Sequence, residues 1–122
     1  MFRIRNVVLV LATAAVAACS VDPNAAYDRR QKLIVDMFPE AQDRQGIHLA
    51  YPVSNSAFEL AYFPDEVRQS VVDRRANKLC GRLGNASKAN YATEPKAYMT
   101  GELPDGTSRK AIKTWYKCAP KQ

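Results

Sequence analysis

An uncharged apolar run near the N-terminus, ending in Val16-Ala17-Ala18-Cys19, constrains this chain more than any other feature. It follows a short segment that carries two cations, Arg3 and Arg5, and it covers the twelve residues 7–18. A basic start, an apolar stretch and small residues at a cleavage point are the layout of a secretory signal. A membrane-spanning helix needs ~20 apolar residues, so this run is too short to be one. The pattern therefore predicts export, with a mature chain that begins near Cys19.

The same four residues, Val16-Ala17-Ala18-Cys19, resemble the lipobox of bacterial lipoproteins. The resemblance implies that residues 1–18 are a cleaved signal peptide and that Cys19 carries a covalent lipid. Several acyl chains hold a protein on a membrane permanently, because each buried CH₂ contributes ~0.8 kcal/mol. Ser20 after the modified cysteine implies sorting to the outer membrane, facing the periplasm. The alternative is ordinary cleavage after Ala15-Val16-Ala17, which leaves Cys19 as a free thiol.

Three cysteines are an odd number for an exported protein, which calls for an intermolecular bond or a free thiol. With Cys19 lipidated, as the resemblance implies, Cys80 and Cys118 remain as one pair in an oxidising compartment. A disulfide between them closes a loop of about 38 residues. The chain-entropy model gives such a loop a stabilisation of roughly 4 kcal/mol.

The chain that follows the signal has the length of one small domain and contains no repeats or second apolar run. Residues 19–24 are predicted to be a short tether, which reaches at most ~17 Å when extended. Residues 25–122 are predicted to be a single domain. Removing Arg3 and Arg5 lowers the net charge from +6 to +4, which mildly favours anionic partners. Export removes the domain from the cytoplasm and so argues against nucleic acid as a partner.

Hydrophobic spacing predicts an α+β domain: a small antiparallel sheet, in the order α-β-β-α-β-β, with a helix packed on one face. The predicted elements are a helix over Ala25–Phe38, strands over 47–53 and 57–63, a helix from Pro64-Asp65-Glu66 to about Leu83, and a hairpin of Ala97–Leu103 and Ser108–Cys118 around a Pro104-Asp105-Gly106 turn. Pro52 is expected on an edge strand, because proline has no N–H to donate to a neighbour.

Strand alternation then predicts a candidate ligand face. If Cys118 bonds Cys80, it faces the helix, and Trp115 points to the other side of the sheet. The residues predicted to share that side are Arg109, Lys113, Trp115 and Lys117. Cations beside an aromatic ring can bind phosphate, carboxylate or sugar groups. The alternative is a solvated face on which the lysine stems cover Trp115. The helix cations Arg74, Arg75, Lys78 and Arg82 are likewise expected on a solvated flank.

No catalytic or metal-binding pattern is found in the sequence. The single histidine, His48, has no orienting carboxylate at a recognisable spacing. Cys80, Cys118 and His48 lack the spacing of a zinc site. We therefore expect no catalytic residue, no metal and no cofactor other than the lipid on Cys19. The sequence favours a small non-enzymatic envelope lipoprotein, an accessory or binding module close to the membrane. The alternatives are a module that binds an anionic envelope polymer and a lipoprotein subunit, with an envelope protein partner, of a secretion or efflux assembly.

Overall fold

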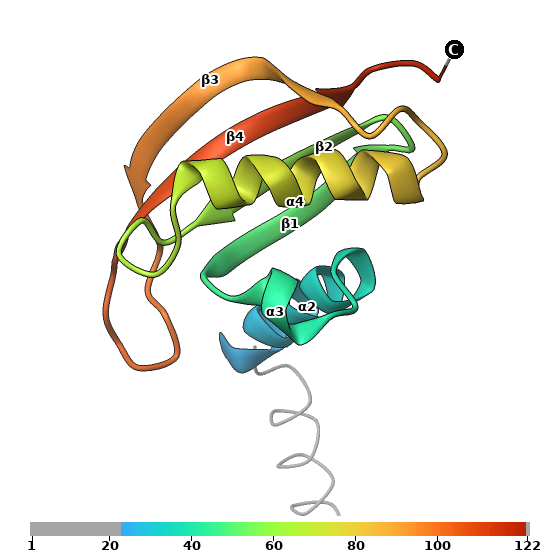
Figure 1. Ribbon diagram of the computed structural model, residues 1–122. Coiled ribbons are helices and arrows are strands. Elements are labelled where there is room, and N and C mark those ends of the chain that lie inside the picture. The colour runs from blue at the N-terminus through green and yellow to red at the C-terminus, as the bar shows by residue number, and fades with distance from the viewer. Residues whose placement is uncertain (1–22, 122) are drawn as a thin grey trace, which may run out of the picture.

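The computed structural model describes residues 23–121, in which helices and strands follow the predicted α-β-β-α-β-β order with one extra helical turn (Figure 1). The elements are α2 (Pro23–Met37), α3 (Ala41–Arg44), β1 (Ile47–Ser54), β2 (Ala57–Tyr62), α4 (Gln69–Arg82), β3 (Ala89–Met99) and β4 (Lys110–Cys118). The predicted α+β class is therefore confirmed. Residues 1–18, Cys19 and the start of the tether lie outside the described residues.

The four strands form one antiparallel sheet in the order β1-β2-β4-β3. α4 lies across one face of this sheet, and α2 and α3 lie beside β1 (Figure 1). Each of the two edge strands contains a proline, Pro52 in β1 and Pro95 in β3. The edge position predicted for Pro52 is confirmed, and it fits a residue that has no N–H to donate.

The core lies between α4 and the sheet and extends to the C-terminal half of α2. Alternate residues of β2 point into it, as do the residues of α4 that share one helical stripe. The buried side chains include Ile34 and Met37 of α2, Phe38 directly after it, Phe58, Leu60 and Tyr62 of β2, and Val72, Ala76 and Leu79 of α4. One continuous core thus holds α2 and α4 on the sheet.

A disulfide joins Cys80 of α4 to Cys118 at the end of β4, with 5.5 Å between the two Cα atoms. The predicted pairing and the predicted strand parity are both confirmed. Thr114, Tyr116 and Cys118 are buried towards α4, whereas Trp115 lies on the opposite face and is partly exposed. The bond fixes the C-terminal half of α4 to the last strand of the chain.

The start of α4 differs from the prediction: the helix begins at Gln69 and not at Pro64-Asp65-Glu66. The carbonyl of Phe63 accepts hydrogen bonds from the N–H groups of Glu66 and Val67, which makes a separate turn. Val67 is buried against Gly46, where a Cβ atom would lie 2.6 Å from its Cγ1 atom. Gly46 also has a φ of +78°, so both the close approach of Val67 and the backbone conformation require glycine.

The last hairpin is confirmed, and β4 lies within two residues of the predicted Ser108–Cys118, but the first strand does not lie at the predicted Ala97–Leu103. β3 begins at Ala89 and ends at Met99, and the connecting loop runs from residue 100 to 109. The predicted turn at residues 104–106 closes this loop, where the Gly106 N–H donates to the carbonyl of Leu103. Pro95 made the first half of β3 hard to predict as a strand. Its edge position and a register irregularity between Thr93 and Lys96 accommodate it.

Candidate functional site

Three of the four residues of the predicted ligand face share the sheet face that points away from α4. Lys113, Trp115 and Lys117 alternate along β4 on that side. Trp115 lies opposite Glu59 of β2 and Thr93 of β3. Tyr51 of β1 lies opposite Glu59 in turn, so the row Tyr51–Glu59–Trp115–Thr93 crosses the whole sheet.

Arg109 lies apart from this row, at the end of the sheet, and its charge is already engaged. Its Nη2 atom lies 2.7 Å from Glu66 Oε2 and 2.9 Å from Asp65 Oδ1. Its guanidinium also covers the ring of Phe63 at 3.8 Å from the ring centroid. The hydrogen bond to Glu66 and the nearby charge of Asp65 raise the pKa of Arg109, against the opposing effect of burial. Arg109 therefore fixes the turn before α4 to the end of β4.

Lys113 also has partners within the domain. Its Nζ atom lies 3.9 Å from Glu59 Oε1 and 5.5 Å from the centroid of the Tyr98 ring. Lys117, by contrast, is exposed and lies opposite Ala57 and Asn90, neither of which is charged. Lys117 and Trp115 are thus the members of the predicted face that are most available to a ligand.

Tyr51 is a member of this face that the sequence prediction missed. Its side chain is 53% exposed, which makes it the most accessible aromatic residue of the row. The alternation of β1 predicted its strand, but the pairing of β1 with β2 decides that Tyr51 lies beside Glu59. This pairing register was not readable from the sequence.

Of the α4 cations expected on a solvated flank, Arg74, Lys78 and Arg82 are exposed, whereas Arg75 is buried. Arg75 is only 8% exposed and donates to the carbonyls of Gln42 and Gln45, at the C-terminal end of α3. Arg82 donates to the carbonyl of Met37, at the C-terminal end of α2. Cations at these positions satisfy carbonyls that have no partner within the helix. Arg75 and Arg82 therefore link α4 to α3 and to the end of α2.

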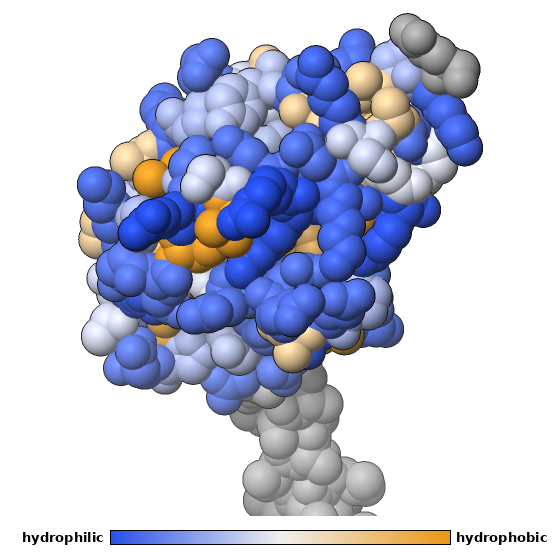
Figure 2. Space-filling model, viewed as in Figure 1, coloured by the Kyte–Doolittle hydropathy of each residue, from blue (hydrophilic) through white to orange (hydrophobic). Residues whose placement is uncertain are grey.

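Beside α4, the surface has a shallow hollow of about 270 Å³, lined by Gln42, Asp43, Val71, Arg74, Arg75 and Lys78. Figure 2 shows an apolar patch enclosed by strongly hydrophilic side chains next to the N-terminal half of α4. Lys78 in this hollow pairs with Asp43 at 3.0 Å and with Glu40 at 3.4 Å. Ion pairs within the domain thus neutralise part of the positive charge that lines the hollow.

A second polar cluster, between α4 and the sheet, was not predicted. The carboxylate of Asp73 accepts hydrogen bonds from the hydroxyls of Tyr91 and Tyr116, both at 2.7 Å, and from Gln69 Nε2 at 3.0 Å. Tyr62 donates to Gln69 Oε1 at 2.6 Å. These residues come from α4 and from three strands, so no spacing along the chain could reveal them. The Asp73 cluster (Tyr62, Gln69, Asp73, Tyr91 and Tyr116) joins α4 to all three strands.

His48 lies in β1, half-buried against Phe63, with 5.1 Å between the ring centroids. Burial lowers the pKa of His48, and the positive charges of Arg30 and Arg109 lower it further. Among the described residues, no carboxylate forms an ion pair with His48 that could orient it as a catalytic base. Within residues 23–121, no three His, Cys, Asp or Glu side chains are grouped so that they could hold a metal ion.

Comparison of this chain with protein-family models, with curated proteins and with solved structures finds no match. The function must therefore be argued from the chain itself. Of the helices in residues 23–121, none has the length and apolar character needed to cross a membrane.

Proposed function

We propose that this chain is a small non-enzymatic lipoprotein of the bacterial envelope, attached to the membrane through a lipid on Cys19. The lipid places the domain on the periplasmic side of the outer membrane, following the serine at position 20. There it acts as an accessory or binding module close to the membrane surface.

The observation that carries this proposal is the use of the cysteines. Cys80 and Cys118 are bonded to each other, so Cys19 is the one remaining cysteine of the three in the chain. It stands at the position that the lipobox-like motif gives to the modified residue. α2 begins at Pro23, so only three residues separate Cys19 from the folded domain. A spacer of this length holds the domain within roughly 15 Å of the attachment point.

Metabolic labelling with a clickable fatty acid tests the attachment. The wild-type protein should take up the label, and a Cys19→Ser variant should not. A Cys80→Ala/Cys118→Ala variant is the matched control, because it loses two cysteines but keeps the predicted modification site. Continued labelling of Cys19→Ser would contradict the proposal. Release of the wild-type protein into the soluble periplasmic fraction would instead support ordinary secretory cleavage.

A second candidate function is the binding of an anionic envelope polymer on the sheet face. The observation that favours it is the pair Trp115 and Lys117, which are successive residues on one face of β4, with no acidic residue opposite Lys117. An ammonium group beside an indole ring can hold a phosphate or carboxylate of a polymer while a sugar packs on the ring.

Retention on immobilised lipopolysaccharide at rising salt tests this second function. Trp115→Ala and Lys117→Ala should each release the protein at lower salt than the wild type. Arg109→Ala is the control for Lys117→Ala, because it removes the same charge from a residue whose guanidinium is already engaged by Asp65 and Glu66. If all three variants are retained like the wild type, this face is only a solvated surface.

A further inference from the structure

The carboxylate of Asp73 has three hydrogen-bond donors and no cationic partner. Its donors are the hydroxyls of Tyr91 and Tyr116 and the amide of Gln69, all of which are neutral. Within residues 23–121, no Lys, Arg or His forms an ion pair with Asp73. Asp73 is half-buried, so its charge is only partly screened by water and can attract a cation from solution.

The tyrosine protons remain in place at neutral pH. Burial and the Asp73 carboxylate raise the pKa of Tyr91 to about 12, and the same two causes raise the pKa of Tyr116. Both hydroxyls are therefore donors under physiological conditions, and the cluster has no internal cation with which to balance its charge.

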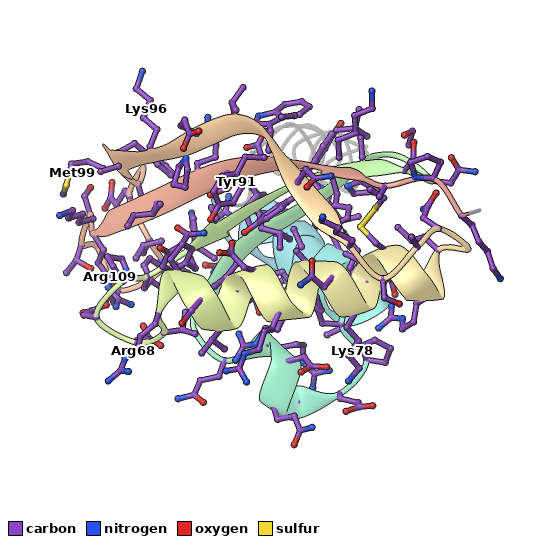
Figure 3. All side chains as sticks on the ribbon, turned by 45° about the horizontal axis from the view of Figure 1, so that its top comes forward. Arg68, Lys78, Tyr91, Lys96, Met99 and Arg109 are labelled. Atoms are coloured by element: carbon purple, nitrogen blue, oxygen red, sulfur yellow. A yellow bond between two sulfur atoms is a disulfide. The ribbon has the colours of Figure 1, made fainter. Side chains whose placement is uncertain are left out.

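This carboxylate lines an open cleft between α4 and β3. The cleft has a volume of about 240 Å³ and is lined by Asp73, Asn77, Ala89, Asn90 and Tyr91. Tyr91 is 40% exposed, so its side chain forms an accessible wall of the cleft. In Figure 3, Tyr91 lies between the ribbons of β3 and α4, whereas Lys96 and Met99 lie towards the far end of β3. No basic residue lines this cleft.

From this geometry we infer that the α4–β3 cleft binds a cationic group, either a primary ammonium or a guanidinium. The Asp73 carboxylate supplies the charge-assisted hydrogen bond, and the Tyr91 ring supplies an aromatic surface that attracts a cation. Glu94, which is close enough to contribute to the raised pKa of Tyr91, adds to the negative potential around the ring.

Other ligand classes fit this cleft less well. A phosphate or carboxylate would be repelled by Asp73, and a neutral group would leave the carboxylate without a counter-charge. The cleft therefore favours a cationic ligand. The surface formed by Trp115 and Lys117, on the other side of the sheet, favours an anionic one. The inference rests on residues 69–116 alone and does not depend on lipid attachment at Cys19.

NMR titration of the intact protein in zwitterionic micelles tests the inference. The probes are N-acetyl-lysine methylamide, N-acetyl-arginine methylamide and ethanolamine, with the uncharged N-acetyl-norleucine methylamide as the comparison. Saturable shifts of the backbone amides of Asn77, Asn90 and Tyr91 are expected with a cationic probe and not with the norleucine probe. The order of the three cationic probes distinguishes a lysine or arginine side chain from an amine-bearing lipid headgroup.

Variants separate a ligand site from a purely structural cluster. Asp73→Asn keeps the size of the side chain and should raise Kd for the tightest cationic probe about tenfold or more. Asp28→Asn, an exposed aspartate of α2, makes the same charge change and should leave Kd unaltered. Tyr91→Leu should weaken binding severalfold, whereas Tyr91→Phe should keep most of it because the ring remains.

Two results would overturn the inference: equal shifts with the norleucine and lysine probes, or an unchanged Kd in Asp73→Asn. If Asp73→Asn fails to fold, the comparison of Tyr91→Leu with Tyr91→Phe decides, because Tyr91 is partly exposed and both variants lose the same hydroxyl. Repeating the titration with Cys19→Ser separates this site from the lipid attachment, since binding should persist when labelling is lost.

Discussion

Arg75 illustrates how a single side chain of α4 differs from what its sequence neighbourhood indicates. Spacing along the helix placed it beside Arg74 and Lys78, on a stripe that was expected to face solvent. In the fold, its guanidinium reaches two carbonyls at the end of α3, while Arg74 stays exposed. The position of α3 depends on how α2 packs, and α3 itself is too short to show periodicity. The sequence therefore predicted neither the position of α3 nor the contact of Arg75 with it.

Arg75→Ala should therefore destabilise the domain, and Arg74→Ala should not. Loss of two charge-assisted hydrogen bonds at a buried position predicts a decrease of about 2–3 kcal/mol in the free energy of unfolding. Substitution of the exposed neighbour should change it by no more than about 0.5 kcal/mol. Urea unfolding followed by circular dichroism measures both. Equal losses in the two variants would show that Arg75 has no special role.

His48 should make the stability of the domain sensitive to mild acid. Its pKa in the folded protein lies below the usual value of 6.5, so the unfolded chain takes up the proton first as the pH falls. The stabilisation is thus fully present above pH 6.5 and is lost as the pH falls towards the lowered pKa. His48 is the only histidine in the chain, so few other side chains titrate in this window.

The measurement is the urea midpoint of the wild type and of His48→Gln between pH 7.5 and pH 5.5. The wild type should lose stability below pH 6.5, and the variant should lose less. Parallel curves throughout this range would mean that protonation of His48 costs the fold nothing.

At the scale of elements, the positions of β1 and β2 and the faces of the residues in β4 were predicted more accurately than the start of α4. The strands β1 and β2 lie where their alternating residues placed them, within one residue at each end. The face of each residue in β4 followed from one assumption, the bond between Cys80 and Cys118. The start of α4 was wrong because Asp65 and Glu66 resemble an acidic first helical turn but instead bind Arg109. The sequence contains no sign of that distant partner.

The Cys80–Cys118 bond should contribute a large share of the stability of so small a domain. Its loop of 38 residues predicts a loss of roughly 4 kcal/mol when the bond is removed. Cys80→Ala/Cys118→Ala measured in urea tests this value. The reduced wild type, with both thiols intact, is the control and should be destabilised by a similar amount. An unfolding midpoint that does not change on reduction would contradict the prediction.

For the whole molecule, the position of α2 determines which end of the domain faces the membrane if Cys19 is lipidated as proposed. The first turns of α2 lie beside the β3–β4 loop, because Asn24, Tyr27, Arg30, Glu102, Leu103 and Pro104 line one hollow. The β1–β2 turn lies at the other end of the sheet (Figure 1), where Asn85 Nδ2 donates to the carbonyl of Asn55. The β3–β4 loop is therefore the end closest to the attachment point.

Energy transfer to acceptor-labelled lipids measures this orientation. A fluorophore introduced through an unnatural azide residue at position 102 should transfer energy more efficiently than one at position 55. Both positions are exposed, so neither label should disturb the core. Equal transfer from the two positions would indicate that the domain tumbles freely on its spacer. More transfer from position 55 would reverse the proposed orientation.

The prolines at the two edges of the sheet have a consequence for many copies of the domain on one surface. Proteins confined to a membrane meet one another at high local density, where exposed strand edges can join into growing ribbons. Pro52 and Pro95 each remove a hydrogen-bond donor from an outermost strand, and the irregularity beside Pro95 bends the second edge. Neighbouring copies thus lack a continuous edge on which to polymerise, and the sheet can tolerate crowding in two dimensions.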